Sequence, residues 1–339
     1  MKLTTALLVV FAGSITAGTI APPRSGGTWT QLPNITLFDR QEHSTVAIGN
    51  TIYIVGGIAP IANSTADPTT PIVQSYSIPH QTWTLEAPLP KALNHPNTAV
   101  VNGKIYVLGG LAVGPGQWPN WLAAGDCYVY NPATHTWKSL GNMPIGTARG
   151  AAAVGVHGDT IYVGGGLSRL GIEGQETLDI TSSYNTRTGA WTSLPPLPEK
   201  RDHAGGALID GVFYVVGGRI NGTPEGMRDT VFALDVTCSP LIWKTRKARM
   251  PTRKGGLAVG VVGDVIVAVG GEGNVDAVSG VFNQTEAYDT KRDVWTKMTP
   301  MRVPRHGTAG VGVGNGVFIP GGGVVRQLGA TSYFDVFKV

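Results

Sequence analysis

The sequence predicts an all-β protein built from six repeated units that close into a ring. An aliphatic strand that ends in a glycine doublet recurs six times, and successive doublets begin 53, 55, 53, 53 and 51 residues apart. Glycine makes up 48 of 339 residues, about twice its usual share, without the three-residue period of collagen. A period near fifty residues is typical of repeat architectures. The doublets are Gly56-Gly57, Gly109-Gly110, Gly164-Gly165, Gly217-Gly218, Gly270-Gly271 and Gly321-Gly322.

Each unit is predicted to hold four short strands. The second unit shows this best, with strands at 97–101 and 104–108 joined by Asn102-Gly103, a strong two-residue hairpin signal. A long loop over 111–125 precedes two further strands, at 126–130 and 136–140. The glycine doublet fits the inner part of each unit because glycine permits a close backbone approach and a positive φ.

A downstream pair of aromatic residues predicts how the ring closes. Five units carry an aromatic residue followed by Trp, whereas the sixth has Tyr333 and then ends at Val339 without one. The missing Trp lies near the start of the chain, at Trp29, so the first strand is expected to complete the last unit. Closure of this kind leaves only short, protected strand edges. We interpret these aromatics as core: Tyr76/Trp83, Tyr130/Trp137, Tyr184/Trp191, Phe232/Trp243 and Tyr288/Trp295.

The doublets, the downstream aromatic and the spaced Trp resemble the Kelch repeat over about residues 28–339. This resemblance implies a six-bladed β-propeller, with 19–339 as one domain. Two departures are modest: Val267 replaces the usual Tyr of the inner strand, and Pro320 precedes the last doublet. Fold alone does not assign chemistry, because unrelated activities share one scaffold.

The N-terminus predicts a secretory route. Residues 1–18 combine Lys2, a short apolar stretch and small residues near position 18, the pattern of a cleaved signal peptide. Four glycosylation sequons follow, at Asn34, Asn63, Asn221 and Asn283. Cys127 and Cys238 could pair there, but they lie in non-neighbouring repeats, which favours two separate buried thiols.

Charge and hydropathy exclude some partners. The net charge of +4 falls to about +3 without Lys2, so bulk charge does not favour a polyanion. The basic run at 244–254 is interpreted as an outer strand that deters edge pairing, not as a nucleic-acid patch. No internal apolar run is long enough to cross a bilayer. We expect a secreted monomer that binds a small molecule.

Two features of one face are candidate site elements. The longest loops of the units, such as 111–125 and 167–179, fall on the same face, where binding residues usually lie. Loops that enter each next unit place basic side chains at nearly fixed spacing, and we expect these to form a polar ring that binds an anion, an enolate or a hydroxylated ring. The alternative is that they bind loop carbonyls and seal the channel. The ring residues are His43, His95, Arg149, Arg201, His203, Arg253, Arg305 and His306.

Trp118 and Trp121 lie in the second long loop and are expected to form a lid or an apolar pocket wall, or else to pack within the loop. Arg219 and Arg326, in neighbouring loops, are predicted to bind substrate. We expect no metal or cofactor, because no histidine spacing matches a known ligand set. The nearest pattern, that of the nitrile-specifier relatives, begins at Glu225 and Asp229 but has Ala233 where its histidine belongs. Kelch-like copper oxidases have seven blades and a longer chain.

The sequence leaves three candidate functions. A propeller pocket could orient a reactive molecule, so the first is a cofactor-independent cyclase or isomerase of natural-product biosynthesis; the build resembles fungal secondary-metabolite proteins, including hetero-Diels–Alderases. The second is a non-catalytic module that binds a glycan or a protein, a common use of Kelch propellers. The third is a sugar mutarotase, as in Kelch-like sialic-acid epimerases, which needs an acid and a base on either side of a bound ring.

Overall fold

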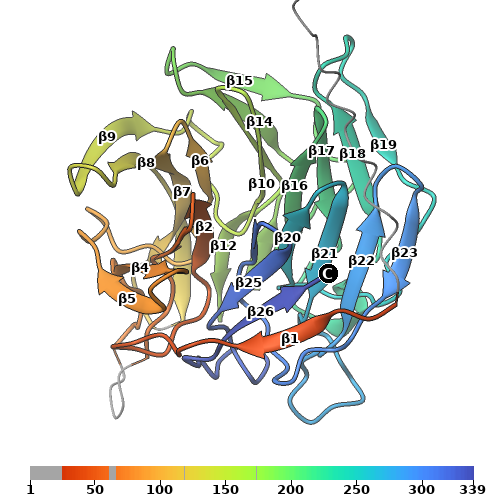
Figure 1. The fold of residues 1–339 in the computed structure, drawn as a ribbon. Helices are drawn as coiled ribbons and strands as arrows, with labels where there is room; N and C mark the ends of the chain where they lie inside the picture. The colour runs from red at the N-terminus through yellow and green to blue at the C-terminus, as the bar shows by residue number, and fades with distance from the viewer. Residues whose placement is uncertain (1–24, 61–65, 118, 173) are drawn as a thin grey trace, which may run out of the picture.

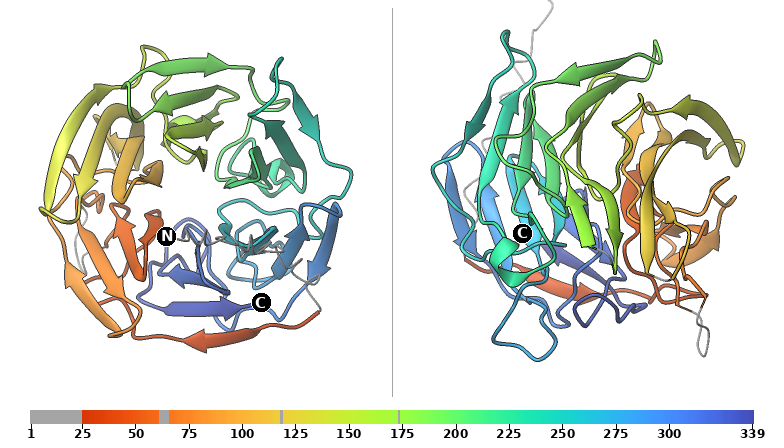
Figure 2. Two further views of the ribbon diagram at one scale, coloured as in Figure 1. Left: turned by 45° about the horizontal axis from the view of Figure 1, so that its top comes forward. Right: turned by 180° about the vertical axis from the view of Figure 1, so that it is seen from behind.

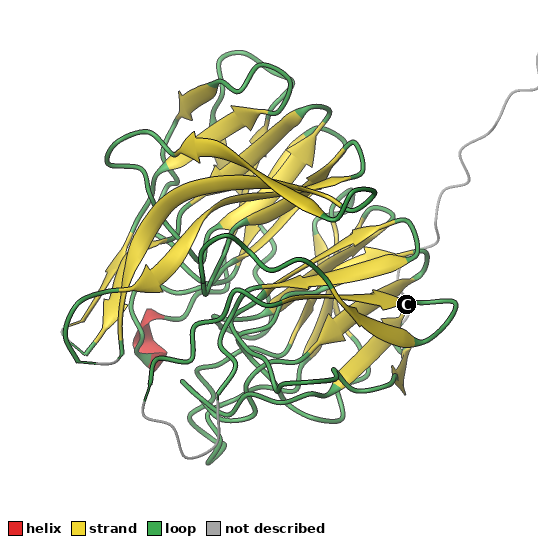
Figure 3. Ribbon diagram, turned by 90° about the vertical axis from the view of Figure 1, so that its left-hand side faces the viewer, coloured by secondary structure: helices red, strands yellow, loops and turns green. Residues whose placement is uncertain are grey.

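The computed structural model describes residues 25–60, 66–117, 119–172 and 174–339, and it shows six β-sheets arranged as blades around a central axis (Figures 1 and 2). The prediction of an all-β, six-bladed propeller is therefore confirmed. Within the described ranges, the only helical element is the short 3-10 turn η1 (Pro224–Gly226), drawn red in Figure 3. The predicted signal peptide, residues 1–18, lies outside the described residues.

Blades 1 to 3 follow the chain order, and each strand pairs antiparallel with the next. Blade 1 contains β2 (Ser44–Ile48), β3 (Thr51–Val55), β4 (Val73–Ser77) and β5 (Thr82–Leu85). Blade 2 contains β6 (Thr98–Val101), β7 (Lys104–Val113), β8 (Asn120–Asn131) and β9 (Thr136–Asn142). Blade 3 contains β10 (Ala153–His157), β11 (Thr160–Gly164), β14 (Thr181–Asn185) and β15 (Trp191–Leu194).

Blades 4 to 6 repeat the same meander. Blade 4 contains β16 (Gly205–Ile209), β17 (Val212–Val216), β18 (Val231–Asp235) and β19 (Trp243–Thr245). Blade 5 contains β20 (Ala258–Val262), β21 (Val265–Val269), β22 (Thr285–Asp289) and β23 (Val294–Lys297). Blade 6 contains β24 (Val311–Val313), β25 (Gly316–Pro320) and β26 (Phe334–Lys338), and its outer strand is β1 (Thr28–Gln31).

The ring closes as the aromatic pattern predicts. β1 pairs with β26 so that Trp29 lies opposite Phe337, and their rings stand 5.1 Å apart between centroids. Figure 1 shows β1 along the outer edge of β26, close to the C-terminus. The last blade is thus completed by the N-terminal strand.

The repeated tryptophans join neighbouring blades. The indole N–H of Trp137 in blade 2 donates to the Ala87 carbonyl of blade 1 at 2.9 Å, and Trp243 donates in the same way to Pro195 of blade 3. The hydrophobic clusters also contain residues of adjacent blades, such as Val216 and Ile266. The Tyr and Phe members of the aromatic pairs are buried core as interpreted, whereas the tryptophans are half-buried and pack against the core clusters.

Two long loops are more regular than predicted. β7 and β8 extend into the expected 111–125 loop as a hairpin in which Val113 lies opposite Trp121. The expected 167–179 loop contains a second ribbon, β12 (Leu167–Gly171) with β13 (Gly174–Thr177). β12 also pairs with β8, so the two stretches predicted as long loops contain strands, because backbone pairing between two blades orders both.

The glycine doublets lie where each second strand approaches the following blade. At Gly56, φ is +61°, and an added Cβ would stand 2.4 Å from the Leu93 carbonyl oxygen, so no larger residue fits. In blade 3 the equivalent pair is Gly165-Gly166, one residue later than predicted, because Gly164 still belongs to β11.

Two further expectations have clear outcomes. Cys127 and Cys238 are separate thiols as expected, but only Cys127 is buried; Cys238 is exposed because it lies in the turn after β18, beside Asp235. Among the residues that the structure describes, no helix is long and apolar enough to cross a membrane.

Candidate functional site

Six backbone hydrogen bonds form a closed ring around the propeller axis, one residue per blade. Each residue donates its N–H to the carbonyl of the ring residue in the preceding blade, at 2.6–3.0 Å. We call these six positions the axial ring; they are Glu42, His95, Ala151, His203, Gly256 and Gly307.

All six axial-ring residues have a left-handed backbone, with φ between +48° and +62°. This conformation favours glycine and costs other residues about 1–2 kcal/mol. Gly256 and Gly307 adopt it without that cost, whereas Glu42, His95, His203 and also Ala151 bear it. Strained backbones with polar side chains are frequent at functional sites, because the side chain is needed where it stands.

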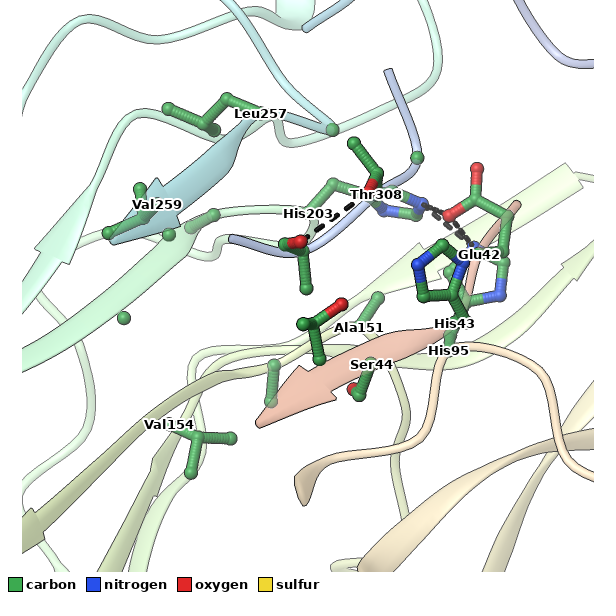
Figure 4. A pocket seen from close by; sticks show the side chains of 18 of the residues that line it. Glu42, His43, Ser44, His95, Ala151, Val154, His203, Leu257, Val259 and Thr308 are labelled. Atoms are coloured by element: carbon green, nitrogen blue, oxygen red, sulfur yellow. Dashed lines mark hydrogen bonds and ion pairs between the residues drawn. The ribbon is translucent and has the colours of Figure 1, made fainter. Parts of the chain in front are cut away.

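The three polar ring residues separate two cavities. On the long-loop face lies a cavity of about 500 Å³, the loop-face cavity. Beneath it runs an axial channel of about 190 Å³ lined by the innermost strands. Glu42, His95 and His203 line both, and Figure 4 shows their side chains converging at one end of the channel, away from Val154 and Val259.

His95 is the centre of this convergence. Its Nε2 lies 3.0 Å from Glu42 Oε2 and 3.0 Å from His203 Nε2. Its Nδ1 lies 2.6 Å from the side-chain oxygen of Asn94, so Nδ1 donates a proton there. Asn94 in turn donates to Thr69 Oγ1 at 2.7 Å. The orientation of the imidazole is therefore fixed from behind, and Nε2 faces the cavity.

His203 is held by a buried carboxylate. Its Nδ1 donates to Asp202 Oδ1 at 2.7 Å. Burial, followed by the charge of Arg219, lowers the pKa of His203, which favours the neutral imidazole. A neutral imidazole that donates through Nδ1 keeps a lone pair on Nε2. That lone pair lies 3.3 Å from Arg219 Nη2, so His203 offers an acceptor to the cavity.

Arg219 is bound between two carboxylates. Its Nε donates to Asp202 Oδ1 at 2.9 Å, and its Nη1 donates to Glu272. Burial alone would raise the pKa of each carboxyl, but it is outweighed by the hydrogen bond from His203 at Asp202 and by the charge of Arg219 at Glu272, so both pKa values are lowered. Arg219 keeps its charge, because these carboxylates outweigh the opposite effect of burial and raise its pKa.

The buried floor carries more negative than positive fixed charge. Burial would raise the pKa of Glu42, but the charge of His95 and a hydrogen bond from it, the largest of the opposing effects, outweigh burial and lower that pKa. Three carboxylates, Glu42, Asp202 and Glu272, therefore face one buried guanidinium. His306 lies beside them, its Nδ1 3.7 Å from Glu272 Oε2, while its Nε2 donates to the Val325 carbonyl at 2.8 Å.

The walls of the loop-face cavity are apolar. Trp121, Leu170, Ile172 and Leu328 line it together with the polar floor. Trp121 is only 6% exposed; its indole donates to Thr69 Oγ1 at 3.1 Å, and its ring stands 6.2 Å from that of His95. Trp121 thus forms part of a pocket wall, one of the two roles expected. Trp118 lies outside the described residues.

The predicted arginines divide into two groups. Arg219 lies at the cavity floor and Arg326 at its rim, where Arg326 donates to the Gly222 carbonyl. Arg149, Arg201 and Arg305 are buried inside the blades and line neither cavity. Arg149, for example, donates to the Val163 carbonyl at 3.0 Å and to Ser182 Oγ at 2.7 Å. The contacts of these three arginines fit the alternative given in the sequence analysis, in which the basic side chains bind backbone carbonyls.

Two placements in the predicted polar ring were wrong. Arg253 is exposed and pairs with Asp229 at 3.4 Å, and Lys254 takes the buried place instead, 3.0 Å from Glu286. The four histidines do not share one position: His95 and His203 are in the axial ring, His306 precedes it and His43 follows it. His43 lines the channel, where burial and then the charge of Arg40 lower its pKa to about 3. A shift of one residue along the chain, relative to the axial-ring position, turns the side chain toward a different surface.

Glu42 and Asp202 were not among the predicted site residues. When the units are aligned on their buried basic residue (Arg40, Arg149, Arg201, Lys254, Arg305), Glu42 takes the same place as His203, two residues downstream, and this signal could have found Glu42. Asp202, one residue after Arg201, has no such signal. Of the predicted glycosylation sites, Asn34 and Asn221 are exposed and Asn283 is half-buried. Asn63 lies outside the described residues.

Comparison with known proteins supports the fold and identifies relatives of this chain. Residues 25–275 match the family model described as Attractin/LZTR1 beta-propeller, and residues 253–302 match the Kelch motif. Kelch-like protein terF of Aspergillus terreus is 40% identical over 340 residues, which cover 98% of this chain and 72% of that protein.

More distant relatives are longer proteins. Kelch repeat and BTB domain-containing protein 12 of Danio rerio is 30% identical over 207 residues, and the match covers 56% of this chain but 31% of that protein. The solved "Structure of YjhT" superposes with a TM-score of 0.71 at 18% identity and covers 91% of this chain and 95% of the other, which shows the shared fold.

Proposed function

This chain belongs to the Kelch-repeat β-propeller family, and we propose that it binds a small organic molecule in the loop-face cavity and converts it as an isomerase or cyclase. The observation that carries this is the cavity itself: about 500 Å³, with apolar walls on one side and three buried imidazoles on its floor. A pocket of this size suits a small molecule, and convergent polar groups orient it. The secretory route and the monomeric state remain part of the proposal.

The floor supports acid–base chemistry without covalent attachment. His203 Nε2 accepts a proton from the bound molecule, and Asp202 holds the imidazole in the tautomer that can do so. Arg219, 3.3 Å away, donates to the oxygen on which negative charge develops. The apolar wall formed by Trp121 and Leu170 fixes the conformation of the carbon skeleton, which is what a ring closure or an isomerisation needs.

The aromatic groups favour this function over a glycan-binding module. A module of that kind presents exposed aromatic faces, whereas Trp121 is turned into the cavity and is 6% exposed. The polar atoms that a sugar would meet are at the bottom of the cavity, beneath Ile172 and Leu328.

The test is capture of a ligand followed by turnover. The protein is incubated with a metabolite extract of an Aspergillus culture and examined by native mass spectrometry. We expect a bound compound with the native protein, and its loss in Leu328→Trp, which fills the cavity rim. The matched control Leu85→Trp, on an exposed outer strand, should keep the compound.

The captured compound is then offered to native protein and to His203→Gln. We expect conversion to a product of equal mass, at least about 100-fold slower in the variant. Binding that survives Leu328→Trp, or equal conversion by His203→Gln, would overturn the proposal.

A further inference from the structure

We propose that Glu42, His95 and His203 form a binding site for a divalent cation of the zinc class. The three residues come from blades 1, 2 and 4, and they meet only because the axial ring brings these blades together. Each offers one ligand atom, and the three atoms lie within 4.8 Å of one another. Two imidazoles and one carboxylate are a donor set that Zn²⁺ accepts.

The spacing of the donor atoms fits a cation at their centre. His95 Nε2 lies 3.0 Å from both Glu42 Oε2 and His203 Nε2, and the third side of the triangle, between His203 Nε2 and Glu42 Oε2, measures 3.9 Å. Zinc bonds of about 2.0–2.1 Å in a tetrahedron place ligands about 3.3 Å apart. The three distances bracket that value, so only small side-chain movements are needed.

The outer contacts of both imidazoles are those of metal ligands. A ligating histidine donates its other ring N–H to an oxygen, which fixes the tautomer and aims the free nitrogen. His95 does this with Asn94 and His203 with Asp202. Both histidines therefore present Nε2, and the cavities above and below leave space for a further ligand.

The local charge also favours a cation. The guanidinium of Arg219 is the group that would repel it, 3.3 Å from His203 Nε2. Arg219 is compensated by both Asp202 and Glu272, which leaves the carboxylate of Glu42 to meet a positive ion. A divalent ion would bring the floor, with its three carboxylates, closer to neutrality.

Occupation of this site has a consequence for the proposed function. One lone pair on His203 Nε2 cannot hold a proton and a metal ion together. A bound cation is therefore expected to suppress the acid–base reaction. The binding proposal itself needs no substrate, so it can be tested even if the proposed reaction is wrong.

The experiment uses Zn²⁺ alone. Native protein freed of metal with a chelator is titrated with Zn²⁺ by isothermal calorimetry, and Co²⁺ absorption reports the coordination number. We expect one equivalent and a Co²⁺ spectrum stronger than that of the hexaaqua ion. His95→Ala and Glu42→Gln should weaken binding by more than about 100-fold, since loss of an outer contact alone costs about 10–100-fold.

Two further variants separate a ligand effect from loss of fold. Asn94→Ala keeps all three ligand residues but removes the contact behind His95, together with the Asn94 hydrogen bond to Thr69, and should weaken Zn²⁺ about tenfold or more. The exposed His157→Ala should bind like the native protein. Thermal unfolding in chelator shows which variants are folded. Absence of a saturable equivalent in the native protein, or native affinity in folded Asn94→Ala and Glu42→Gln, would overturn the proposal.

Discussion

The backbone of the axial ring has the same conformation in all six blades, but the side chains differ between blades. Blades 1, 2 and 4 place Glu42, His95 and His203 there, and blades 3, 5 and 6 place Ala151, Gly256 and Gly307. Hydrogen bonds and φ angles do not distinguish the two groups. The scaffold therefore does not require the polar residues, and the backbone cost of keeping them indicates that their side chains have a function.

The largest expected effect comes from a substitution inside a blade, in the structure that supports the axial ring. Arg149→Ala removes a fully buried guanidinium and its hydrogen bonds, among them those to the Val163 carbonyl and to Ser182 Oγ. We expect a loss of about 3 kcal/mol or more in the free energy of unfolding, measured in urea. Arg253→Ala, at an exposed residue, should change it by less than about 0.5 kcal/mol; similar values for the two would contradict the structural role.

A smaller effect is expected at Gly307, a glycine of the axial ring that lies beside the polar ring residue Glu42. A Cβ on Gly307 would stand 2.2 Å from Glu42 Oε1, whereas on Gly256 it would meet nothing closer than 3.4 Å. Gly307→Ala should therefore displace the Glu42 carboxylate and weaken Zn²⁺ by at least about tenfold. Both variants bear a similar backbone cost of about 1–2 kcal/mol, so Gly256→Ala controls for it and should bind Zn²⁺ normally.

The smallest effect tests the backbone cost itself. Ala151 has φ +52° and no polar group that could justify it. Ala151→Gly relieves about 1–2 kcal/mol of strain and loses about 0.4–1 kcal/mol through the greater freedom of the unfolded chain. We expect a net gain of about 0.5 kcal/mol in urea denaturation. A clear destabilisation would show that the left-handed ring costs these residues little.

The fold could be predicted because its signals are local and repeated. The glycine doublets and tryptophans recur at nearly constant spacing, and Trp29 supplies the one missing copy. The two ribbons β7/β8 and β12/β13 were missed, because their strands are ordered by pairing between blades, which no single repeat reveals.

The site was harder to predict because it is assembled across blades. Glu42, His95 and His203 are separated by 53 and 108 residues in the sequence, so they form no linear motif. Because the spacing in the sequence is only approximate, the prediction also treated three neighbouring positions as one. In blade 6 these are Arg305, His306 and Gly307, which face the blade interior, the cavity floor and the axial ring, respectively. Only the hydrogen-bond ring shows which residue of each loop belongs to which surface.

The pairing of β1 with β26 ties the site to the timing of synthesis. During synthesis Glu42 emerges well before its backbone partner, Gly307, and before β26, the strand that pairs with β1 in blade 6. A nascent or prematurely ended chain therefore has an open ring, with Glu42 unsupported on one side. Only a chain translated through β26 can present the assembled floor, so fragments released by a stalled ribosome before that point should lack the proposed site.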